Sequence, residues 1–178
     1  MKYFDEMCRA MEFLAHDERV LFIGQAVAVP GTAMTKTLKN VCCDRLIEFP
    51  VAEEMQMGIA TGMALAGFVP VSIYPRWNFL LLAVNQLVNH LDKIPEISRG
   101  GFQPRVIIRT GIGSERPLHP QHQHVGDFTD AFRLMCKNVE VIRLEEPQDI
   151  FPAYQKALER TDGKSTLIVE YGDYYSEK

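Results

Sequence analysis

The sequence predicts an α/β protein, a three-layer α/β/α sandwich built on a mainly parallel sheet, with residues 1–178 forming a single domain. Short apolar runs suited to buried strands alternate along the chain with segments whose apolar residues recur at helical spacing. Such alternation favours parallel strands joined by right-handed helical crossovers. A chain of 178 residues, 47% of them hydrophobic, is large enough for one sizeable core.

The first half of the chain follows this alternation. It reads, in order, as an amphipathic helix at 1–16, a strand at 19–24, a loop at 25–32, a helix at 33–40 and a strand at 44–49. Pro50 breaks the second strand, and Glu53 opens a helix with apolar residues at helical spacing. Gly67 is suited to end that helix before a buried strand at 68–74.

Two carboxylates, Glu53 and Glu54, fall in the first turn of this helix, directly after the carboxyl end of a strand. Ligands of open α/β sheets bind in the crevice at that edge. Acidic residues in a first turn also serve simply to cap a helix and to interact favourably with its dipole. From spacing alone both interpretations stay open.

The second half completes the pattern. Trp77, Asn78 and Phe79 precede a long helix at 80–94 that carries an apolar stripe. Strands are predicted at 105–109, 140–144 and 166–170, separated by helices at 129–136 and 147–160. Pro147 suits the first turn of the last helix. Residues 171–178 are too few to form a further domain.

The most polar long loop, at 110–127, contains His119, His122 and His124. Three histidines suggest zinc, but no Cys or carboxylate completes a familiar ligand pattern, so no metal site is predicted. Gly111 and Gly113 follow a strand as a phosphate-binding turn would, yet the third glycine and an immediately following helix are missing. An ordinary surface loop is the default interpretation.

Charge and cysteine usage exclude several classes of protein. A net charge of −4 gives no reason to expect nucleic acid or an anionic membrane as partner. The amino terminus is acidic where a secretory signal is basic, and no apolar run approaches the ~20 residues of a membrane helix. Cys8, Cys42, Cys43 and Cys136 form no Cys-x-x-Cys pair, so reduced thiols in a cytoplasmic protein are expected.

A set of residues between Pro50 and Asn89 resembles the pyrimidine-binding domain of thiamine diphosphate enzymes of the transketolase superfamily. The set comprises Pro50 to Glu53, the pair Gly58 and Gly62, Gly67 with Pro70-Val71, Phe79, and the segment NQLVN at 85–89. The closest likeness is to the beta subunit of the decarboxylating component of 2-oxo acid dehydrogenases, such as pyruvate dehydrogenase. It covers roughly residues 19–170.

The resemblance implies roles for individual residues. Glu53 matches the glutamate that bonds N1′ of the cofactor's aminopyrimidine and promotes proton loss at the thiazolium C2. Phe79 matches the aromatic residue that stacks on the pyrimidine ring, and Met57 is a candidate for the pocket wall, although a core position is the alternative for both. His124, or nearly as well His122, matches a histidine that faces the reactive carbon.

Two departures from the family pattern qualify the function that is implied. The chain lacks Gly-Asp-Gly followed by Asn, the family's signature for holding Mg²⁺ and the diphosphate, so a separate alpha-type subunit would hold them, in an α₂β₂ assembly. We also expect the beta subunits' carboxyl-terminal domain to be missing, and Gln25-Ala26 stands where those subunits usually have an acidic pair. Dehydrogenation, decarboxylation, carboligation and ketol transfer of a 2-oxo acid or sugar therefore all remain possible reactions.

Three hypotheses follow. The leading one is the pyrimidine-binding subunit of a split thiamine diphosphate enzyme, inactive alone. The second is a non-catalytic scaffold or regulatory subunit, for which replacing Glu53 would leave the assembled activity intact. The third is a self-sufficient hydrolase or metal enzyme that uses the histidine loop; the lack of a nucleophile elbow argues against its hydrolase form.

Overall fold

A computed structural model describes residues 1–113, 115 and 119–178. Within these residues one sheet of six parallel strands runs in the order β2-β1-β3-β4-β6-β5. The strands are β1 (Val20–Gly24), β2 (Leu46–Glu48), β3 (Val69–Ile73), β4 (Ile107–Ile112), β5 (Val139–Arg143) and β6 (Ser165–Tyr171). The predicted α/β class and parallel pairing are confirmed.

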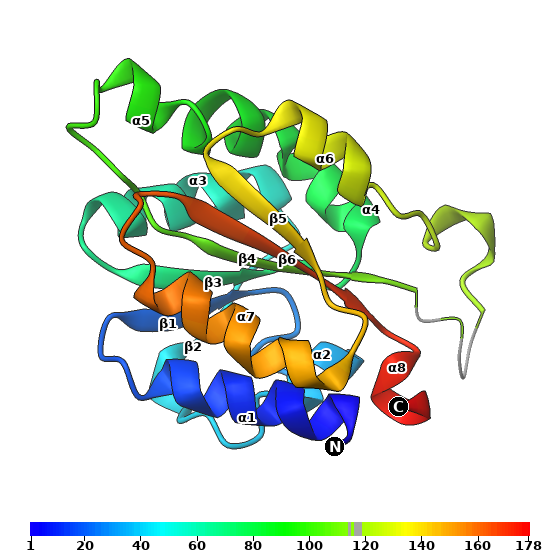
Figure 1. Ribbon diagram of the computed structural model, residues 1–178. Coiled ribbons are helices and arrows are strands. Elements are labelled where there is room, and N and C mark those ends of the chain that lie inside the picture. The colour runs from blue at the N-terminus through cyan, green and yellow to red at the C-terminus, as the bar shows by residue number, and fades with distance from the viewer. Residues whose placement is uncertain (114, 116–118) are drawn as a thin grey trace.

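Helices cover both faces of this sheet (Figure 1). The long ones are α1 (Tyr3–Ala15), α3 (Glu53–Leu65) and α7 (Pro147–Glu159); shorter ones are α2 (Ala33–Lys36), α4 (Trp77–Leu80), α5 (Ile94–Ile97), α6 (Thr129–Met135) and α8 (Tyr174–Glu177). One apolar cluster joins α1, α2 and α7 to one face, and a second joins α3, α4 and α6 to the other. The three-layer sandwich is therefore confirmed.

The predicted helix at 80–94 is wrong in detail, because the segment is divided into short pieces. A 3₁₀ turn, η2 (Leu81–Ala83), follows α4 and is itself followed by a π-helical stretch, η3 (Gln86–Leu91). Just beyond η3, the fully buried Asp92 accepts N–H bonds from Lys137 at 2.8 Å and Asn138 at 2.6 Å. A tertiary anchor of this kind, at the entry to β5, competes with regular helix geometry.

One other segment differs from prediction, and a further short helix lies where no element was predicted. The helix expected at 33–40 ends at Lys36, after which Thr37, Leu38 and Val41 form single turns. Residues 171–178 include the short helix α8, which packs on α1; the rings of Tyr174 and Tyr175 lie 5.6 and 5.8 Å from that of Tyr3. The two termini lie side by side, since the Tyr3 N–H donates to the Lys178 carbonyl at 2.9 Å (Figure 1).

A fully buried ion pair joins β4 to β6. Arg109 Nε donates to Glu170 Oε1 at 2.5 Å and Nη2 to Oε2 at 2.9 Å. Thr37 after α2, Tyr154 on α7 and Tyr175 on α8 complete the cluster by hydrogen bonds to one partner or the other. Burial disfavours the charged guanidinium, but Glu170 more than offsets this and raises the pKa of Arg109.

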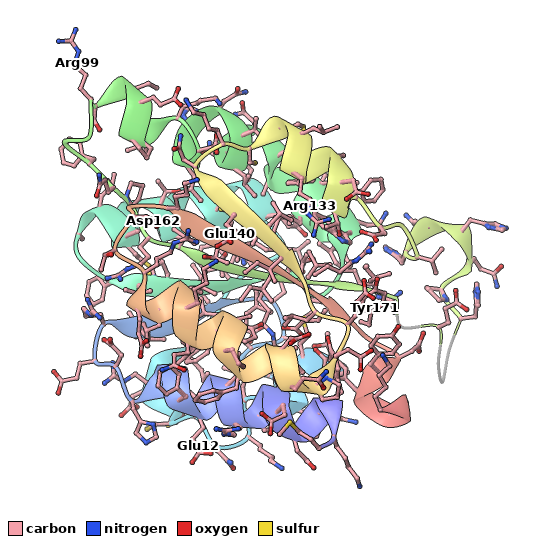
Figure 2. The ribbon with its side chains drawn as sticks, viewed as in Figure 1. Glu12, Arg99, Arg133, Glu140, Asp162 and Tyr171 are labelled. Atoms are coloured by element: carbon pink, nitrogen blue, oxygen red, sulfur yellow. The ribbon has the colours of Figure 1, made fainter. Side chains whose placement is uncertain are left out.

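We expect Arg109→Met to lower the free energy of unfolding by about 3–5 kcal/mol, because the Glu170 carboxylate would stay buried without its cation. Urea denaturation followed by circular dichroism measures the difference. Arg99→Gln is the control, since Arg99 projects into solvent from the 98–101 turn (Figure 2) and its loss should cost less than about 0.5 kcal/mol. A loss below about 1 kcal/mol for Arg109→Met would contradict this role.

Candidate functional site

The candidate site lies at the carboxyl edge of the sheet, where the chain leaves β1 and β3. The two strands pair in register up to Gly24 opposite Ile73, so the next residues, Gln25 and Tyr74, are neighbours. The approach is close: a Cβ on Gly24, whose φ is +151°, would lie 2.3 Å from the Ile73 carbonyl oxygen. Only glycine fits there.

Gln25 and Tyr74 both bond Glu53, the first residue of α3. Gln25 Nε2 donates to Glu53 Oε1 at 2.9 Å, and the Tyr74 hydroxyl donates to the Glu53 carbonyl oxygen at 3.2 Å. Glu53 is 4% exposed, and its Oε2 has no hydrogen-bond partner among the described residues. The site thus holds a nearly buried carboxylate by one oxygen and leaves the other available.

A pocket of about 710 Å³ opens at Glu53. Its walls come from the start of α3 and from η2 and η3; the lining residues are Ala52, Glu53, Glu54, Met55, Gly58, Ile59, Leu82 and Gln86. Glu54 is exposed and receives amide N–H groups from Asn85 at 3.3 Å and Gln86 at 3.5 Å. Of the two adjacent carboxylates, therefore, Glu53 is the buried one.

An apolar face surrounds this pocket. Met55, Ile59 and Leu82 are 49%, 42% and 62% exposed, although each is a large hydrophobic residue. Gly62 on the same helix is open, since a Cβ there would meet nothing within 4 Å. A contiguous exposed apolar surface around a pocket is characteristic of an interaction site.

A carboxylate at the end of β2 shapes the loop that carries Gln25. Glu48 accepts the backbone N–H groups of four successive residues, Ala26 to Val29, at 2.7–3.1 Å. Partial burial raises the pKa of Glu48, but these four N–H groups outweigh it, and the pKa is lowered. Ala26 has a φ of +53°, which is strained for a residue with a side chain. Glu48 thus holds a strained loop next to Glu53.

The other predicted site residues differ in how far they are buried. Phe79 on α4 is half-buried and stacks on His124, with ring centroids 5.5 Å apart and planes at 25°. His122 is exposed, and among the described rings it is His124, not His122, that stacks on Phe79. Met57 is fully buried in the apolar core between α3 and the sheet. The structure thus brings Phe79 and His124 together and sets Met57 behind the site.

Five buried side-chain polar atoms lack a hydrogen-bond partner in the described part of the chain, and all belong to residues near this edge of the sheet. They are Gln56 Oε1, Trp77 Nε1, Asn78 Oδ1, Thr110 Oγ1 and His124 Nδ1. Unsatisfied buried groups are rare in folded proteins and cost about 1–3 kcal/mol each. This edge of the sheet therefore carries several polar groups that the described residues leave without a hydrogen-bond partner.

Sequence reasoning missed the residues that support Glu53. Gln25 was noticed only as a departure from an acidic pair, and Tyr74 only as the end of a strand. Glu48 carried a weak signal, as a carboxylate ending a strand opposite a loop rich in small residues. Gln56, one turn beyond Glu53, donates through Nε2 to Ser72 Oγ and to the Ile73 carbonyl oxygen, both at 3.0 Å. Nothing in the sequence pattern indicated these hydrogen bonds.

Residues 114 and 116–118 of the predicted histidine loop lie outside the described residues. Across the rest of the chain, no group of three or more His, Cys, Asp or Glu side chains is placed to hold a metal ion. Nor is any helix there long and apolar enough to cross a membrane. His119 Nε2 lies 3.6 Å from a carboxylate oxygen of Glu115.

Comparison with known protein families identifies the family of this fold. The family model for the transketolase pyrimidine-binding domain matches residues 7–174, so the chain belongs to that family. The resemblance inferred from Pro50 to Asn89 is thereby confirmed.

Among curated proteins, the chain is 34% identical over 145 residues to the 3-methyl-2-oxobutanoate dehydrogenase subunit beta of Mycobacterium tuberculosis. That match covers 78% of this chain and 40% of the relative. The mitochondrial pyruvate dehydrogenase E1 component subunit beta of Homo sapiens is 33% identical over 115 residues, which is 62% of this chain and 32% of the relative. The chain thus spans about two fifths or less of the length of these two relatives.

Solved structures agree on the fold. Transketolase from Leishmania mexicana superposes with a TM-score of 0.69 at 21% identity, over 91% of this chain and 24% of that one. A split-gene transketolase, described as an inactive beta4 tetramer, gives 0.61 at 14% identity, over 94% of this chain and 50% of that one. At these identities the likeness concerns the fold alone.

We expect Glu48→Gln to lower the free energy of unfolding at pH 7 by about 1 kcal/mol. The expected loss is this small because solvent screens the charge of the partly exposed carboxylate. Because the pKa of Glu48 is lowered in the folded protein, its carboxylate contributes fully to the free energy of unfolding at neutral pH. That contribution is lost as the pH falls through the pKa of Glu48 in the folded protein. The difference between variant and parent, measured by urea denaturation, should therefore shrink below about pH 4.

Glu12→Gln serves as the control, because the Glu12 carboxylate accepts only the Asn40 side-chain amide, at 3.2 Å. A Glu48→Gln difference that stays constant down to pH 3 would contradict the hydrogen-bonding role of the carboxylate.

Proposed function

We propose that this chain is the pyrimidine-binding subunit of a thiamine diphosphate enzyme whose cofactor site it shares with a second chain. The observation that carries the proposal is Glu53, a nearly buried carboxylate with one free oxygen beside a pocket. Membership of the transketolase pyrimidine-binding family supports it. So do the names of the curated relatives, which are beta subunits of 2-oxo acid dehydrogenases.

The residues present fit the cofactor's aminopyrimidine. A ring nitrogen that exchanges a proton needs a carboxyl group at hydrogen-bond reach in a dry setting, and Glu53 Oε2 is such a group. Gln25 holds the other oxygen without adding a positive charge, so the carboxyl is not locked in an ion pair. Thiamine diphosphate, when bound, supplies a nucleophilic thiazolium carbon for addition to a substrate carbonyl. In this proposal Glu53 holds and moves the proton at N1′.

The remaining predicted residues take supporting parts. Phe79 offers a ring face next to His124, and the Nδ1 of His124 is buried without a partner, as suits a group that binds substrate or handles a proton. His122 is the alternative for that role. Met57 shapes the site from the core side.

A second chain is required to complete the site. The sequence has no Gly-Asp-Gly and Asn signature for Mg²⁺ and diphosphate, so an alpha-type subunit would hold both, in an α₂β₂ assembly. The exposed apolar face of Met55, Ile59 and Leu82 and the open Gly62 support docking of that subunit around the pocket. The substrate would be a 2-oxo acid or a ketose.

A scaffold subunit that only retains the fold is the second candidate. The substitution of Gln25-Ala26 for the family's acidic pair favours it, because the loop beside Glu53 has diverged. The hydrogen bond from Gln25 to Glu53 argues against the scaffold candidate, because Gln25 still positions the Glu53 carboxylate.

We expect Glu53→Gln to reduce turnover of the reconstituted enzyme at least about 100-fold, because a general acid-base group contributes about 10²–10⁴. Steady-state kinetics with 2-oxo acids and ketoses as donors measure the loss. Glu54→Gln should cost less than about tenfold, because its carboxylate is solvated, and Glu12→Gln on α1 should have no effect. Full turnover in Glu53→Gln would favour the scaffold candidate.

We expect His124→Asn to reduce turnover about 100-fold and His122→Asn to reduce it less than threefold, because only His124 contacts Phe79. Rates of the two variants at saturating substrate separate them, and circular dichroism checks folding. The opposite order would assign the role to His122 and place Phe79 with a different partner.

A further inference from the structure

A pocket of about 380 Å³ lies at the amino edge of the sheet, opposite the edge that carries Glu53 (the amino-edge pocket). The segments that lead into three neighbouring strands line it, and Figure 1 shows the loops before β4 and β6 at the same end of the molecule. Gly67 and Phe68 precede β3, Gln103 and Arg105 precede β4, and Thr161 precedes β6. Because β4 spans six residues, the two edges lie about 20 Å apart. A ligand in this pocket is therefore too far from Glu53 to react there.

Arg105 is a half-buried cation of this pocket, and one edge of its guanidinium group has no partner. Nη1 donates to the carbonyl oxygens of Leu158 at 2.9 Å and Arg160 at 3.0 Å, at the end of α7. Nε and Nη2 form no hydrogen bond or ion pair with any residue that the structure describes. Burial lowers the pKa of Arg105, Arg19 lowers it further, and Asp17 opposes them only in part. The cation is thus held on one side and has no carboxylate in contact on the other.

Two other arginines at the same edge show what this free side of Arg105 is suited to bind. Arg19 donates from Nε and Nη2 to the two carboxylate oxygens of Asp17, at 2.9 and 2.6 Å. Arg160 donates in the same way to Asp162, with both distances 2.7 Å. A parallel pair of N–H groups matches the geometry of a carboxylate. Both of these carboxylates already have an arginine, so Arg105 presents the same pair of donors without an acceptor.

The rest of the pocket wall is partly apolar. Phe68 is 41% exposed, and a Cβ on Gly67 beside it would meet nothing within 4 Å, so the surface next to the ring is open. The side chains of Gln103 and Thr161 have no hydrogen-bond partner among the described residues, and no acidic residue in that part of the chain lines the pocket. Such a wall suits a ligand that is anionic at one end and apolar at the other.

We propose that the amino-edge pocket binds a small carboxylate that carries an apolar group, with Arg105 as its main contact. Nε and Nη2 of Arg105 would hold the two carboxylate oxygens, and the apolar group would lie against Phe68. The carboxylate supplies the missing partner of a half-buried cation, whose desolvation is otherwise costly. Inorganic phosphate would use the same donors but would leave the Phe68 ring uncovered. The ligand is distinct from the substrate of the proposed reaction, and the inference does not depend on that reaction.

Titration of the full, isotopically labelled chain with benzoate, followed by amide shifts in NMR spectra, tests the pocket. Benzoate supplies a carboxylate and an apolar ring, and benzamide is its uncharged counterpart. We expect saturable shifts with benzoate in the millimolar range and at least about tenfold weaker binding of benzamide. The amides expected to shift are those of Gly67, Phe68, Gln103 and Gly163.

Substitutions separate the two parts of the pocket. Arg105→Gln should weaken benzoate binding at least about tenfold, and Arg105→Lys should weaken it as well, because a lysine ammonium lacks the paired N–H groups. Phe68→Ser should weaken the binding of benzoate but not of acetate. Because Phe68 is exposed, this variant tests the pocket even if Arg105→Gln does not fold. Arg99→Gln is the matched control, since Arg99 projects into solvent (Figure 2) and does not line the pocket.

Weaker benzoate binding in Arg105→Gln and Phe68→Ser, with Arg99→Gln unchanged, would support the proposal. Four results would overturn it: no saturable shift at the named amides, equal binding of benzoate and benzamide, unchanged binding in a folded Arg105→Gln, or shifts centred on Gly111 at the opposite edge. Tighter binding of inorganic phosphate than of benzoate would overturn the assignment to an apolar carboxylate. The assay contains neither cofactor nor second subunit, so its result is independent of the proposed function.

Discussion

The buried pair of Arg109 and Glu170 holds the sheet to the segments that pack on one of its faces. It joins two neighbouring strands, and through Thr37, Tyr154 and Tyr175 it binds a loop, a long helix and the last short helix to the same charges. Each charge is tolerable without water only because the other is present and its remaining donors or acceptors are used. The pair thereby stabilises the neighbouring strands β4 and β6 within the sheet.

The site follows from the geometry of that edge. Parallel strands end together, so residues that immediately follow β1 and β3 become neighbours although they are distant in sequence. Gln25 and Tyr74 hold Glu53 from two directions, and Glu48 holds the loop that carries Gln25. The result is a preorganised carboxylate with one oxygen free. The side-chain atoms of Gln56, Trp77 and Thr110 that lack hydrogen-bond partners among the described residues belong to residues near the same edge.

Much of the fold was predictable from sequence because apolar periodicity reports burial directly. The class, the strands and the start of α3 at Glu53 followed from it, and the residue set from Pro50 to Asn89 was specific enough to indicate the family. The segment 80–94 was not predictable in detail, because its interruption depends on Asp92 bonding a turn some 45 residues away in sequence. The carboxyl-terminal helix was missed for the same kind of reason: its tyrosines are placed by tertiary contacts with Tyr3 and Glu170.

The candidate site, like the fold, was predictable from the sequence only in part. A carboxylate in a first turn is visible in sequence, but its burial, its Gln25 partner and the distinction between Glu53 and Glu54 depend on packing. Likewise the stacking of the His124 ring on Phe79 depends on packing and is not visible in the sequence.

The central claim is that Glu53 belongs to a cofactor site completed by another chain. Calorimetric titration of thiamine diphosphate with Mg²⁺ into this chain, into a candidate diphosphate-binding subunit and into their mixture tests it most directly. The account predicts binding by the mixture alone, with one cofactor for each pair of chains. A folded, associated mixture that takes up no cofactor, or equally strong binding by this chain alone, would contradict it.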